Sequence, residues 1–505
     1  MRQRSWRTSI VPIGVGVLLL TAASGAVVFE FDRARGGREV QSWVWPNGDL
    51  SSARSTPASV INATSVGRLR LAWRYRMSGK GGGFGLLTST PLSRGDTAYV
   101  QDTASSVFAI DLRSGRRQWA RRLMEPNDGP NGIALLGDRL YGATDTAVFS
   151  LDAVSGRQVW RTRLANKREQ FIYIAPVVDR GRVYVSTVGF SPGGRGAIYA
   201  LDAVSGKKLW RFDTIRGPWR RPEAGGGGAW EALSVDAQGL VYAGIANPGP
   251  WGGSKEFPNG GLYEGPALYT DSLVVLDGAT GKLRWYDQVH RHDVRDYDFH
   301  LSPVLATVGG RDLVFGGGKG GLVVAWDRET HRRIWTQPVG KHRNDIGPLP
   351  VKPVEVCPGL FGGALTPMAY ADGRVFVPVV ELCMKESSVK TFSVLQRPPE
   401  DATGSIVALD AATGRTLWTR ALPSAAFGCA TVASDVVFAP TFDGRIYALS
   451  ALTGAVLWSD RAEAGINGCP SVAGDTLLVP AGAPHRDFAE LMPQLLAYRL
   501  SSVGT

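Results

Sequence analysis

The chain has 505 residues and a formal net charge of +11, and it is rich in glycine (63) and proline (30). Its basic residues are scattered, and no run of lysine or arginine is interleaved with aromatic residues, which argues against nucleic-acid binding. A solvated basic surface explains this charge. The alternative is long-range attraction of an acidic partner or an anionic ligand.

The N-terminal segment has the pattern of an export signal. Three arginines precede an apolar run over residues 10–29, and small residues near the end of that run offer a cleavage site. The run is long enough to span a bilayer, so cleavage and membrane anchoring are both open. In either case the positive-inside rule places the rest of the chain outside the cytoplasm. We therefore expect a signal peptide or signal-anchor helix over residues 1–32 and one large domain over residues 33–505.

A repeat dominates that large domain. An apolar run ends in Asp, a Gly follows four residues later, and a Trp follows eight residues after the Asp. The Gly is replaced by His331 in the fifth copy and the Asp by Ser450 in the seventh, and LRLAW at Trp73 is a degenerate eighth copy. In chain order, the first and last positions of the seven copies are Asp111/Trp119, Asp152/Trp160, Asp202/Trp210, Asp277/Trp285, Asp327/Trp335, Asp410/Trp418 and Ser450/Trp458.

Each copy has the features of a β-hairpin with one aromatic residue to bury. Runs such as 181–189, 435–449 and 475–482 alternate or are β-branched, which excludes helical repeats. A WD40 repeat would place Trp beside Asp, and a solenoid would leave its end units uncapped. A closed ring leaves only short edges. The sequence therefore predicts an all-β, eight-bladed propeller.

Four cysteines in an exported chain predict two disulfides. Three pairings are possible, and we favour the most local one, Cys357–Cys383 with Cys429–Cys469. Four free thiols are the alternative. The sequence contains no Cys-x-x-Cys-His motif, so we expect no covalently attached haem.

Two intervals between repeats are longer than one blade of about 40–45 residues requires. Trp210 and Trp285 are 75 residues apart, and Trp335 and Trp418 are 83 residues apart. Both intervals therefore contain inserted loops, and loops on a rigid scaffold are the usual place for function.

Six titratable residues lie within residues 290–300: His290, His292, Asp293, Asp296, Asp298 and His300. On a strand, Asp296 and Asp298 would share one face. Two carboxylates on one face suit a hard cation or acid–base chemistry. Zinc fits less well, because the spacing is not that of a closed site and no thiolate is near. The alternative is a solvated loop.

Two further residues stand in glycine-rich surroundings. Trp230 follows the four glycines 225–228, which allow a flat group to approach the backbone while the indole offers a stacking surface. A core tryptophan is the alternative. Lys319 lies among five glycines at 316–321 and suggests an anionic or carbonyl partner, or else a simple turn. Because no Ser, Thr or helix pattern follows the lysine, this is not a phosphate-binding Walker loop.

Four stretches, 45–75, 195–210, 268–285 and 356–383, resemble the pyrroloquinoline-quinone (PQQ)-dependent alcohol dehydrogenases, and the likeness covers nearly all of residues 42–490. This resemblance implies an eight-bladed propeller that works outside the cytoplasm. It also implies a quinone near the axis, a Ca²⁺ or lanthanide ion that polarises the quinone, and an aspartate that takes the alcohol proton while hydride is transferred.

The resemblance places the stacking Trp at Trp230, the metal-binding Asn at Asn247, the catalytic and metal-binding Asp at Asp296, and the cation that contacts the quinone at Lys319. Asp298 takes the position of an extra carboxylate in lanthanide-using members. Some glucose-type members also have Asp there, so Asp298 does not identify the ion. Cys357 and Cys383, both inside the long interval before Trp418, match a family disulfide.

The chain also departs from the family. The metal-binding Glu is replaced by Ser191, an acidic quinone contact by Thr88, an Asn by Leu365, and a cofactor-contacting Thr by Gly228. A hydroxyl is a poor substitute for a bidentate carboxylate. The vicinal cysteine pair that covers the quinone is missing, and the corresponding region is 129–142.

The sequence thus predicts an exported PQQ-dependent dehydrogenase for an alcohol, polyol or sugar, with a separate electron acceptor such as a cytochrome c or a quinone. The alternative is a non-catalytic propeller that binds proteins, as related outer-membrane assembly propellers do. A hydrolytic or sugar-binding propeller ranks last, because Asp296 and Asp298 on one strand face are too close for the usual two-sided attack.

Overall fold

The computed structural model describes residues 42–501 except 80, 83, 128, 167–168, 190–192, 218–223, 252–264 and 388–392, and it leaves the side chains of 393–396 undescribed. The expected export segment, residues 1–32, lies outside the described residues. Contacts group Val40–Thr505 into one unit. In the part of the chain that is described, we find no helix with the length and apolarity needed to cross a bilayer.

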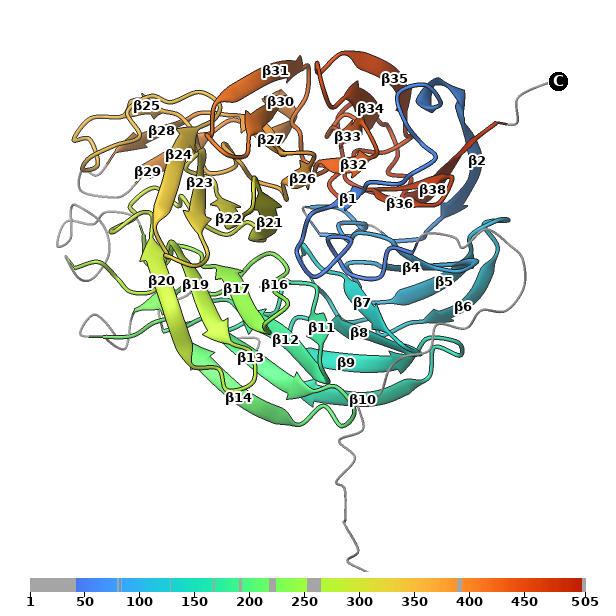
Figure 1. The fold of residues 1–505 in the computed structure, drawn as a ribbon, viewed down its shortest axis with the longest axis horizontal. Helices are drawn as coiled ribbons and strands as arrows, with labels where there is room; N and C mark the ends of the chain where they lie inside the picture. The colour runs from blue at the N-terminus through green and yellow to red at the C-terminus, as the bar shows by residue number, and fades with distance from the viewer. Residues whose placement is uncertain are drawn as a thin grey trace, which may run out of the picture. The chain divides into compact units, whose positions relative to one another are not determined.

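The described residues of this unit form eight sheets, the blades, arranged in a ring (Figure 1); each is built on four antiparallel strands, and one has a short fifth strand. Blade 1 contains β3 (Leu92–Arg94), β4 (Thr97–Gln101), β5 (Val107–Asp111) and β6 (Arg117–Arg121). Blade 2 contains β7 (Ile133–Leu136), β8 (Arg139–Ala143), β9 (Ala147–Asp152) and β10 (Gln158–Arg163). Blade 3 contains β11 (Val177–Asp179), β12 (Arg182–Thr187), β13 (Ala197–Asp202) and β14 (Lys208–Asp213). Blade 4 contains β16 (Ser234–Val235), β17 (Leu240–Gly244), β19 (Ser272–Asp277) and β20 (Leu283–Gln288).

The second half of the ring repeats this order. Blade 5 contains β21 (Val304–Val308), β22 (Arg311–Gly317), β23 (Leu322–Asp327) and β24 (Arg333–Pro338). Blade 6 contains β26 (Ala369–Ala371), β27 (Arg374–Glu381), β30 (Thr403–Asp410) and β31 (Thr416–Leu422). Blade 7 contains β32 (Thr431–Ala433), β33 (Val436–Pro440), β34 (Arg445–Ser450) and β35 (Val456–Arg461). Blade 8 contains β36 (Ser471–Ala473), β37 (Thr476–Ala481), β38 (Gln494–Leu500) and β2 (Leu69–Arg76).

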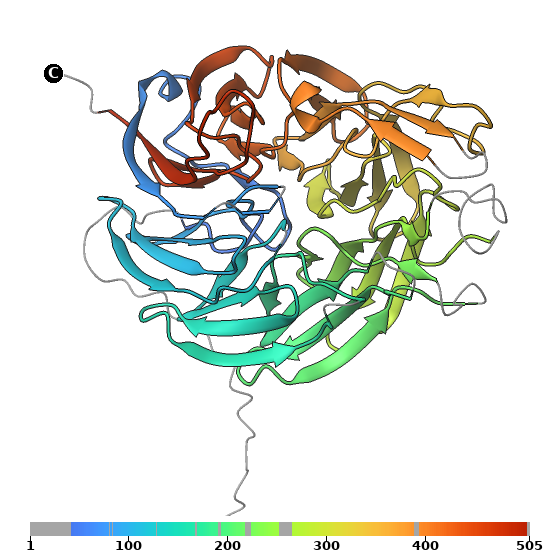
Figure 2. The same cartoon turned by 180° about the vertical axis from the view of Figure 1, so that it is seen from behind.

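The remaining elements are small. The pair β15 (Gly225–Gly226) and β18 (Pro248–Gly249) lies in the first long insertion, and β1 (Ser55–Thr56) runs parallel to β32. The second insertion contains β25 (Val354–Val356), β28 (Met384–Ser387) and β29 (Ser393–Gln396), which lie at the margin of the ring in both views (Figures 1 and 2). Two single-turn 3₁₀ helices are η1 (Val66–Arg68) and η2 (Pro399–Asp401).

The two ends of the propeller chain close the ring. Strand β2 pairs antiparallel with β38, from Leu69 opposite Leu500 to Arg76 opposite Gln494. The first long strand therefore forms the outer edge of the last blade, and the closed ring leaves only the short outer edge of each blade. The prediction of an all-β, eight-bladed propeller is confirmed, with the degenerate copy at Trp73 in the closing strand.

The repeated tryptophans join neighbouring blades. The indole N–H of Trp160 in blade 2 donates to the carbonyl of Ala203 in blade 3 at 3.0 Å. A Cβ at Gly206 would lie 2.5 Å from Trp160 Cε3, and Gly206 has a φ of +71°, so the ring covers a turn that only glycine fits without strain. The same bond to the next blade is made by Trp73, Trp119, Trp210, Trp335 and Trp418.

One blade contact departs from this pattern where the sequence does. His331 takes the glycine position with a φ of 61°, and its imidazole stacks on Trp285 with ring centroids 4.8 Å apart. The indole N–H of Trp285 is buried and has no hydrogen-bond partner among the described residues. Stacking thus replaces the hydrogen bond between blades 4 and 5.

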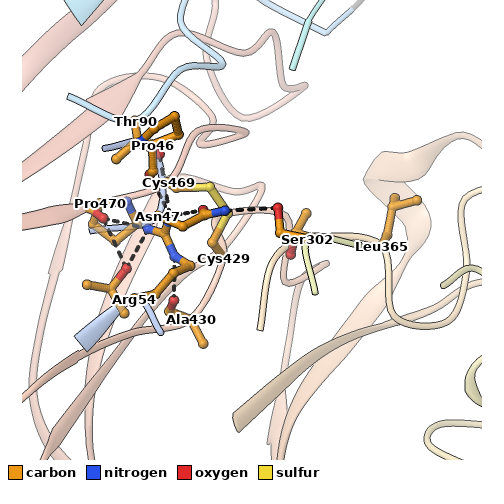
Figure 3. The surroundings of a disulfide bond; sticks show 12 residues. Pro46, Asn47, Arg54, Thr90, Ser302, Leu365, Cys429, Ala430, Cys469 and Pro470 are labelled. Atoms are coloured by element: carbon orange, nitrogen blue, oxygen red, sulfur yellow. Dashed lines mark hydrogen bonds between the residues drawn. A yellow bond between two sulfur atoms is a disulfide. The ribbon is translucent and has the colours of Figure 1, made fainter. Parts of the chain in front are cut away.

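Both disulfides have the expected pairing, Cys357–Cys383 and Cys429–Cys469, with Cα–Cα distances of 4.5 and 5.0 Å. The second joins the segments that enter the innermost strands of blades 7 and 8. Figure 3 shows the guanidinium of Arg54 beside this bond. Arg54 is fully buried and donates to the oxygens of Pro46, Asn47, Thr90, Ala430, Thr431 and Pro470. It therefore ties the N-terminal segment to the inner ends of the last blades.

Candidate active site

The acidic segment lies between β20 and β21 and contains no strand over residues 291–302. The side chain of Asp293 accepts the backbone N–H groups of Arg295 at 2.9 Å and Tyr297 at 2.6 Å, which closes a tight turn. Asp296 lies inside this turn with a φ of 62°. Our assumption of a strand was therefore wrong. The carboxylates of Asp296 and Asp298 converge because the turn folds them together.

Asn247 contacts both of these aspartates. Its side-chain amide donates to Asp296 Oδ1 at 2.8 Å, and its backbone N–H donates to Asp298 Oδ1 at 2.8 Å. Asn247 lies directly before β18, so the first insertion delivers it to the acidic turn. Asn247 and Asp298 are buried, and Asp296 is nearly so, which makes this a protected polar cluster and not a solvated loop.

Lys319 completes the cluster. Its Nζ lies 2.7 Å from Asp296 Oδ2 and 2.5 Å from Asp298 Oδ2, and 4.8 Å from the centroid of the Trp230 ring. Lys319 is only 2 % exposed. The structure thus brings together Trp230 and Asn247 from the first insertion, both aspartates from the connection between blades 4 and 5, and Lys319 from the loop between β22 and β23.

The glycines around Lys319 allow the backbone of the loop 318–321 to contact the backbone at Asp298. The loop 318–321 joins β22 to β23, and the backbone N–H of Lys319 donates to the Asp298 carbonyl at 3.1 Å. A Cβ at Gly318 would lie 1.8 Å from that same carbonyl oxygen, and a Cβ at Gly363 would lie 2.1 Å from the Lys319 carbonyl oxygen. Any side chain at these positions would push the ammonium away from the aspartates.

The glycines before Trp230 have a similar structural role. Gly226 pairs with Pro248, and the N–H of Gly227 donates to the Asn247 carbonyl at 2.8 Å. A Cβ at Gly228, where φ is +106°, would lie 2.3 Å from the Thr187 carbonyl oxygen. Protein atoms therefore occupy the space that these glycines leave, and a cofactor contact at Gly228 stays a prediction.

Burial and mutual repulsion set the charge state of the cluster. Burial raises the pKa of Asp296, against the opposing effect of Lys319 and with Asp298 adding to the rise. Burial likewise raises the pKa of Asp293 to about 6. For Lys319 burial acts in the opposite direction, but the two facing carboxylates outweigh it and raise its pKa. The ammonium is therefore charged at every physiological pH.

A fourth aspartate, which sequence reasoning missed, lies behind this cluster. Asp271 is fully buried directly before β19; its Oδ1 accepts the Phe299 N–H at 3.3 Å, and its Oδ2 has no hydrogen-bond partner among the described residues. Burial, with repulsion from Asp293 and Asp298, raises its pKa well above the ordinary value. Both effects favour the protonated form of Asp271. It belongs to no motif, so only the fold could reveal it.

The three histidines of the acidic segment separate. The ring nitrogens of His300 lie 3.1 Å from the carbonyl oxygens of Asp298 and Leu365, and its ring centroid is 6.1 Å from that of Trp230. His290 and His292 instead line a separate cavity of about 770 Å³. In the described residues, the one group of three or more Asp, Glu, His or Cys side chains close enough to hold an ion is Glu355 with the disulfide-bonded Cys357 and Cys383, so the zinc interpretation finds no support.

The departures from the family pattern have local consequences. Ser191 lies outside the described residues. Thr88 is buried, and its hydroxyl donates to Asn131 Oδ1 at 3.0 Å, inside the segment that takes the place of the vicinal cysteines. Leu365 offers its backbone carbonyl to His300 and no side-chain amide.

The donor set can be compared with the two groups that the resemblance implies. Two carboxylates and an amide are the oxygen ligands that hard cations prefer. The indole of Trp230 is partly exposed beside a fixed ammonium, which suits a flat, anionic, conjugated ring. The residues therefore fit a cation and a quinone, on the condition that the Lys319 ammonium leaves the space between the carboxylates.

Comparison with known proteins assigns the family. Residues 43–134 and 172–339, together more than half of the chain, match the family model described as glucose/ethanol/alcohol dehydrogenase, beta-propeller domain (PQQ). The chain therefore belongs to the PQQ-dependent dehydrogenase propeller family. Residues 391–487 match a second model, that of the outer membrane protein assembly factor BamB.

Individual relatives agree with this assignment. The quinohemoprotein alcohol dehydrogenase of Comamonas testosteroni is 29 % identical over 500 residues, which cover 84 % of this chain and 69 % of that enzyme. Its crystal structure superposes with a TM-score of 0.79 at 24 % identity, covering 92 % of this chain and 81 % of that one. Quinohemoprotein alcohol dehydrogenase ADH IIB of Pseudomonas putida is 26 % identical over 374 residues, which cover 66 % of this chain and about half (52 %) of that enzyme. A europium-containing methanol dehydrogenase shares the fold, with a TM-score of 0.78 at 22 % identity over 91 % of this chain and 98 % of that one.

Proposed function

We propose that this protein is an exported PQQ-dependent dehydrogenase that oxidises an alcohol, a polyol or a sugar, with Asp296 as the general base. The observation that carries the proposal is the convergence of Asp296, Asn247 and Lys319 beside the Trp230 ring. Two disulfides support export, because such bonds persist in oxidising compartments. Whether residues 10–29 remain as a membrane anchor is tested by sequencing the N-terminus of the mature protein.

The residues divide the work between binding and proton transfer. PQQ supplies a two-electron acceptor when bound, and a Ca²⁺ or lanthanide ion supplies Lewis acidity. Trp230 would stack on the flat ring, while Asn247, Asp296 and Asp298 would hold the ion. Lys319 would stabilise negative charge on the reduced quinone.

Asp296 is the group that would take the proton. The substrate hydroxyl loses its proton to Asp296 Oδ while the carbon loses hydride, so the alcohol becomes a carbonyl compound. Burial raises the pKa of Asp296 and so makes it a stronger base, whereas a cation bound beside it would act in the opposite direction. The two electrons would then pass to a separate acceptor such as a cytochrome c or a quinone, since the sequence has no haem-attachment motif.

The direct test is cofactor binding. The purified protein is mixed with PQQ and either Ca²⁺ or La³⁺, separated from free quinone, and examined by absorbance. We expect one quinone per chain and, after loading, dye reduction with members of an alcohol, polyol and sugar panel. Protein that retains no quinone with either ion would contradict the proposal.

A second candidate is a propeller that binds other proteins and has no catalytic activity. The match of residues 391–487 to the BamB model favours it, and so do the altered positions Thr88 and Leu365. Under this function an Asp296→Ala protein keeps every partner interaction of the wild type, and neither protein oxidises an alcohol. Affinity purification of both proteins from the native host, followed by the dye assay, separates the two candidates.

A further inference from the structure

The positive charge between Asp296 and Asp298 belongs to a side chain of the protein itself, Lys319. The Lys319 ammonium lies 2.7 Å from one carboxylate and 2.5 Å from the other, and among the described residues it is the one cationic group within 4 Å of either. Asp298 is fully buried and Lys319 is 2 % exposed, so neither charge is screened by bulk water. Each carboxylate therefore depends on this ammonium for its charge balance.

An ion held by the same two aspartates would need the same space. Hard cations contact carboxylate oxygens at about 2.3–2.6 Å, which is nearly the distance at which the ammonium contacts them now. The two positive charges also repel each other strongly in a buried site. Ion binding at Asp296 and Asp298 thus requires Lys319 to leave.

The surroundings of Lys319 indicate where its ammonium would go. The backbone of Lys319 is fixed by the bond from its N–H to the Asp298 carbonyl and by the glycines on either side. Only the flexible side chain can swing. Its Nζ already lies over the Trp230 ring, 4.8 Å from the centroid, so a flat anionic ring that stacked on this indole would be close enough to attract the ammonium.

We propose that Lys319 is an internal occupant of the cation site, so that a metal ion enters only when the Lys319 ammonium is withdrawn from Asp296 and Asp298. The first half of this inference concerns the cofactor-free chain and is independent of the proposed function. The second half rests on the proposed function: an anionic quinone over Trp230 would draw the ammonium away and so strengthen ion binding. By linkage, the ion would strengthen quinone binding by the same factor.

Terbium provides a direct readout, because Tb³⁺ emits when a nearby indole is excited, and Trp230 flanks the site. We expect the cofactor-free wild type to bind Tb³⁺ weakly and Lys319→Met, which removes the charge, to bind it at least 10-fold more tightly. Lys319→Arg keeps the charge and stays weak, and Lys282→Met removes an exposed lysine of blade 4 as a matched control. Adding Asp298→Asn to Lys319→Met abolishes the gain.

Equal Tb³⁺ affinity in the wild type and Lys319→Met would overturn the inference, and so would a gain that survives Asp298→Asn. Folding is judged by circular dichroism and gel filtration. If Lys319→Met folds only when Tb³⁺ or La³⁺ is present, the inference is supported, because the ion then replaces the ammonium. Lys319→Met that fails to fold even with these ions would overturn it.

The quinone arm uses the wild type with PQQ. A rise of at least 10-fold in Tb³⁺ affinity supports the coupling, and bound PQQ with an unchanged Tb³⁺ affinity would contradict it. If absorbance shows that PQQ does not bind at all, the proposed function and the coupling both fail. The result with Lys319→Met then still decides whether Lys319 occupies the cation site.

Discussion

The side-chain amide of Asn247 donates a hydrogen bond to Asp296 at 2.8 Å, across 49 residues of sequence. This bond leaves Asp296 oriented by Asn247 on one oxygen and by Lys319 on the other. A carboxylate held on both sides is positioned for proton transfer, whereas a structural aspartate would direct its oxygens at its own turn, as Asp293 does.

Replacing Asp296 by Asn should abolish proton acceptance without disturbing the turn. Asn tolerates the left-handed backbone conformation that Asp296 adopts, with a φ of 62°, so the variant should fold. General-base catalysis contributes about 10²–10⁴-fold, so we expect kcat to fall by about that factor in the quinone-loaded enzyme. Steady-state dye reduction measures this loss. Asp312→Asn, at an exposed position of β22, serves as the control with unchanged kcat, and an Asp296→Asn enzyme of full activity would exclude the general-base role.

The glycine of the repeat should be required for two separable reasons. Gly206 and Gly181 have nearly the same φ, +71° and +72°, but a Cβ meets Trp160 only at Gly206 and meets nothing within 4 Å at Gly181. We expect Gly181→Ala to cost about 1 kcal/mol of unfolding free energy from backbone strain alone. Gly206→Ala should cost about 1–3 kcal/mol more, because the methyl group clashes with the docked indole. If denaturant unfolding shows equal losses of unfolding free energy for the two variants, the Trp160 indole moves aside at no cost and the clash is not the cause.

Glu231 should make the protein less stable as the pH rises. Burial raises the pKa of Glu231 to about 8, with Arg54 opposing the rise. The pKa in the folded state is thus above that in the unfolded chain, so this carboxyl stabilises the fold fully below pH 4.5 and loses that contribution as the pH rises through about 8. Glu231→Gln resembles the protonated form. Its melting temperature should match that of the wild type at about pH 4.5 and exceed it above the raised pKa of Glu231.

Other buried acids shift in the same direction, so the informative quantity is the difference between variant and wild type at each pH. Burial raises the pKa of Glu386 to about 7, for example, and that contribution is common to both proteins. Glu329→Gln, at an exposed position, should show no pH-dependent difference. A difference for Glu231→Gln that is constant from acid to alkaline pH would contradict the assigned cause.

The fold was predictable because each blade contains one copy of a sequence repeat. The Asp-to-Trp spacing reappears as a hydrogen bond between neighbouring blades, and even the exception at His331 is visible in both sequence and structure. The site is different. Asp296 and Asp298 could be selected from their sequence, but their convergence depends on a turn closed by Asp293, and a period-two strand rule gave the wrong local structure. Long-range contacts, such as those between Lys319 and the two aspartates, follow only from the closed ring.

Asp271 shows what remained invisible in the sequence, and its charge state can be tested. Because burial and repulsion raise its pKa well above the ordinary value, we expect Asp271 to be neutral, and Asn is its closest neutral substitute. Asp271→Asn should therefore cost only about 1–3 kcal/mol of unfolding free energy at pH 7, the penalty of burying amide N–H groups without an acceptor. Asp298 is equally buried, but Asp298→Asn removes a carboxylate that pairs with Lys319, and breaking a buried pair costs up to about 3–5 kcal/mol. If Asp271→Asn is as destabilising as Asp298→Asn, then Asp271 is ionised in the folded protein and the cluster carries one more negative charge for Lys319, or a cation, to balance.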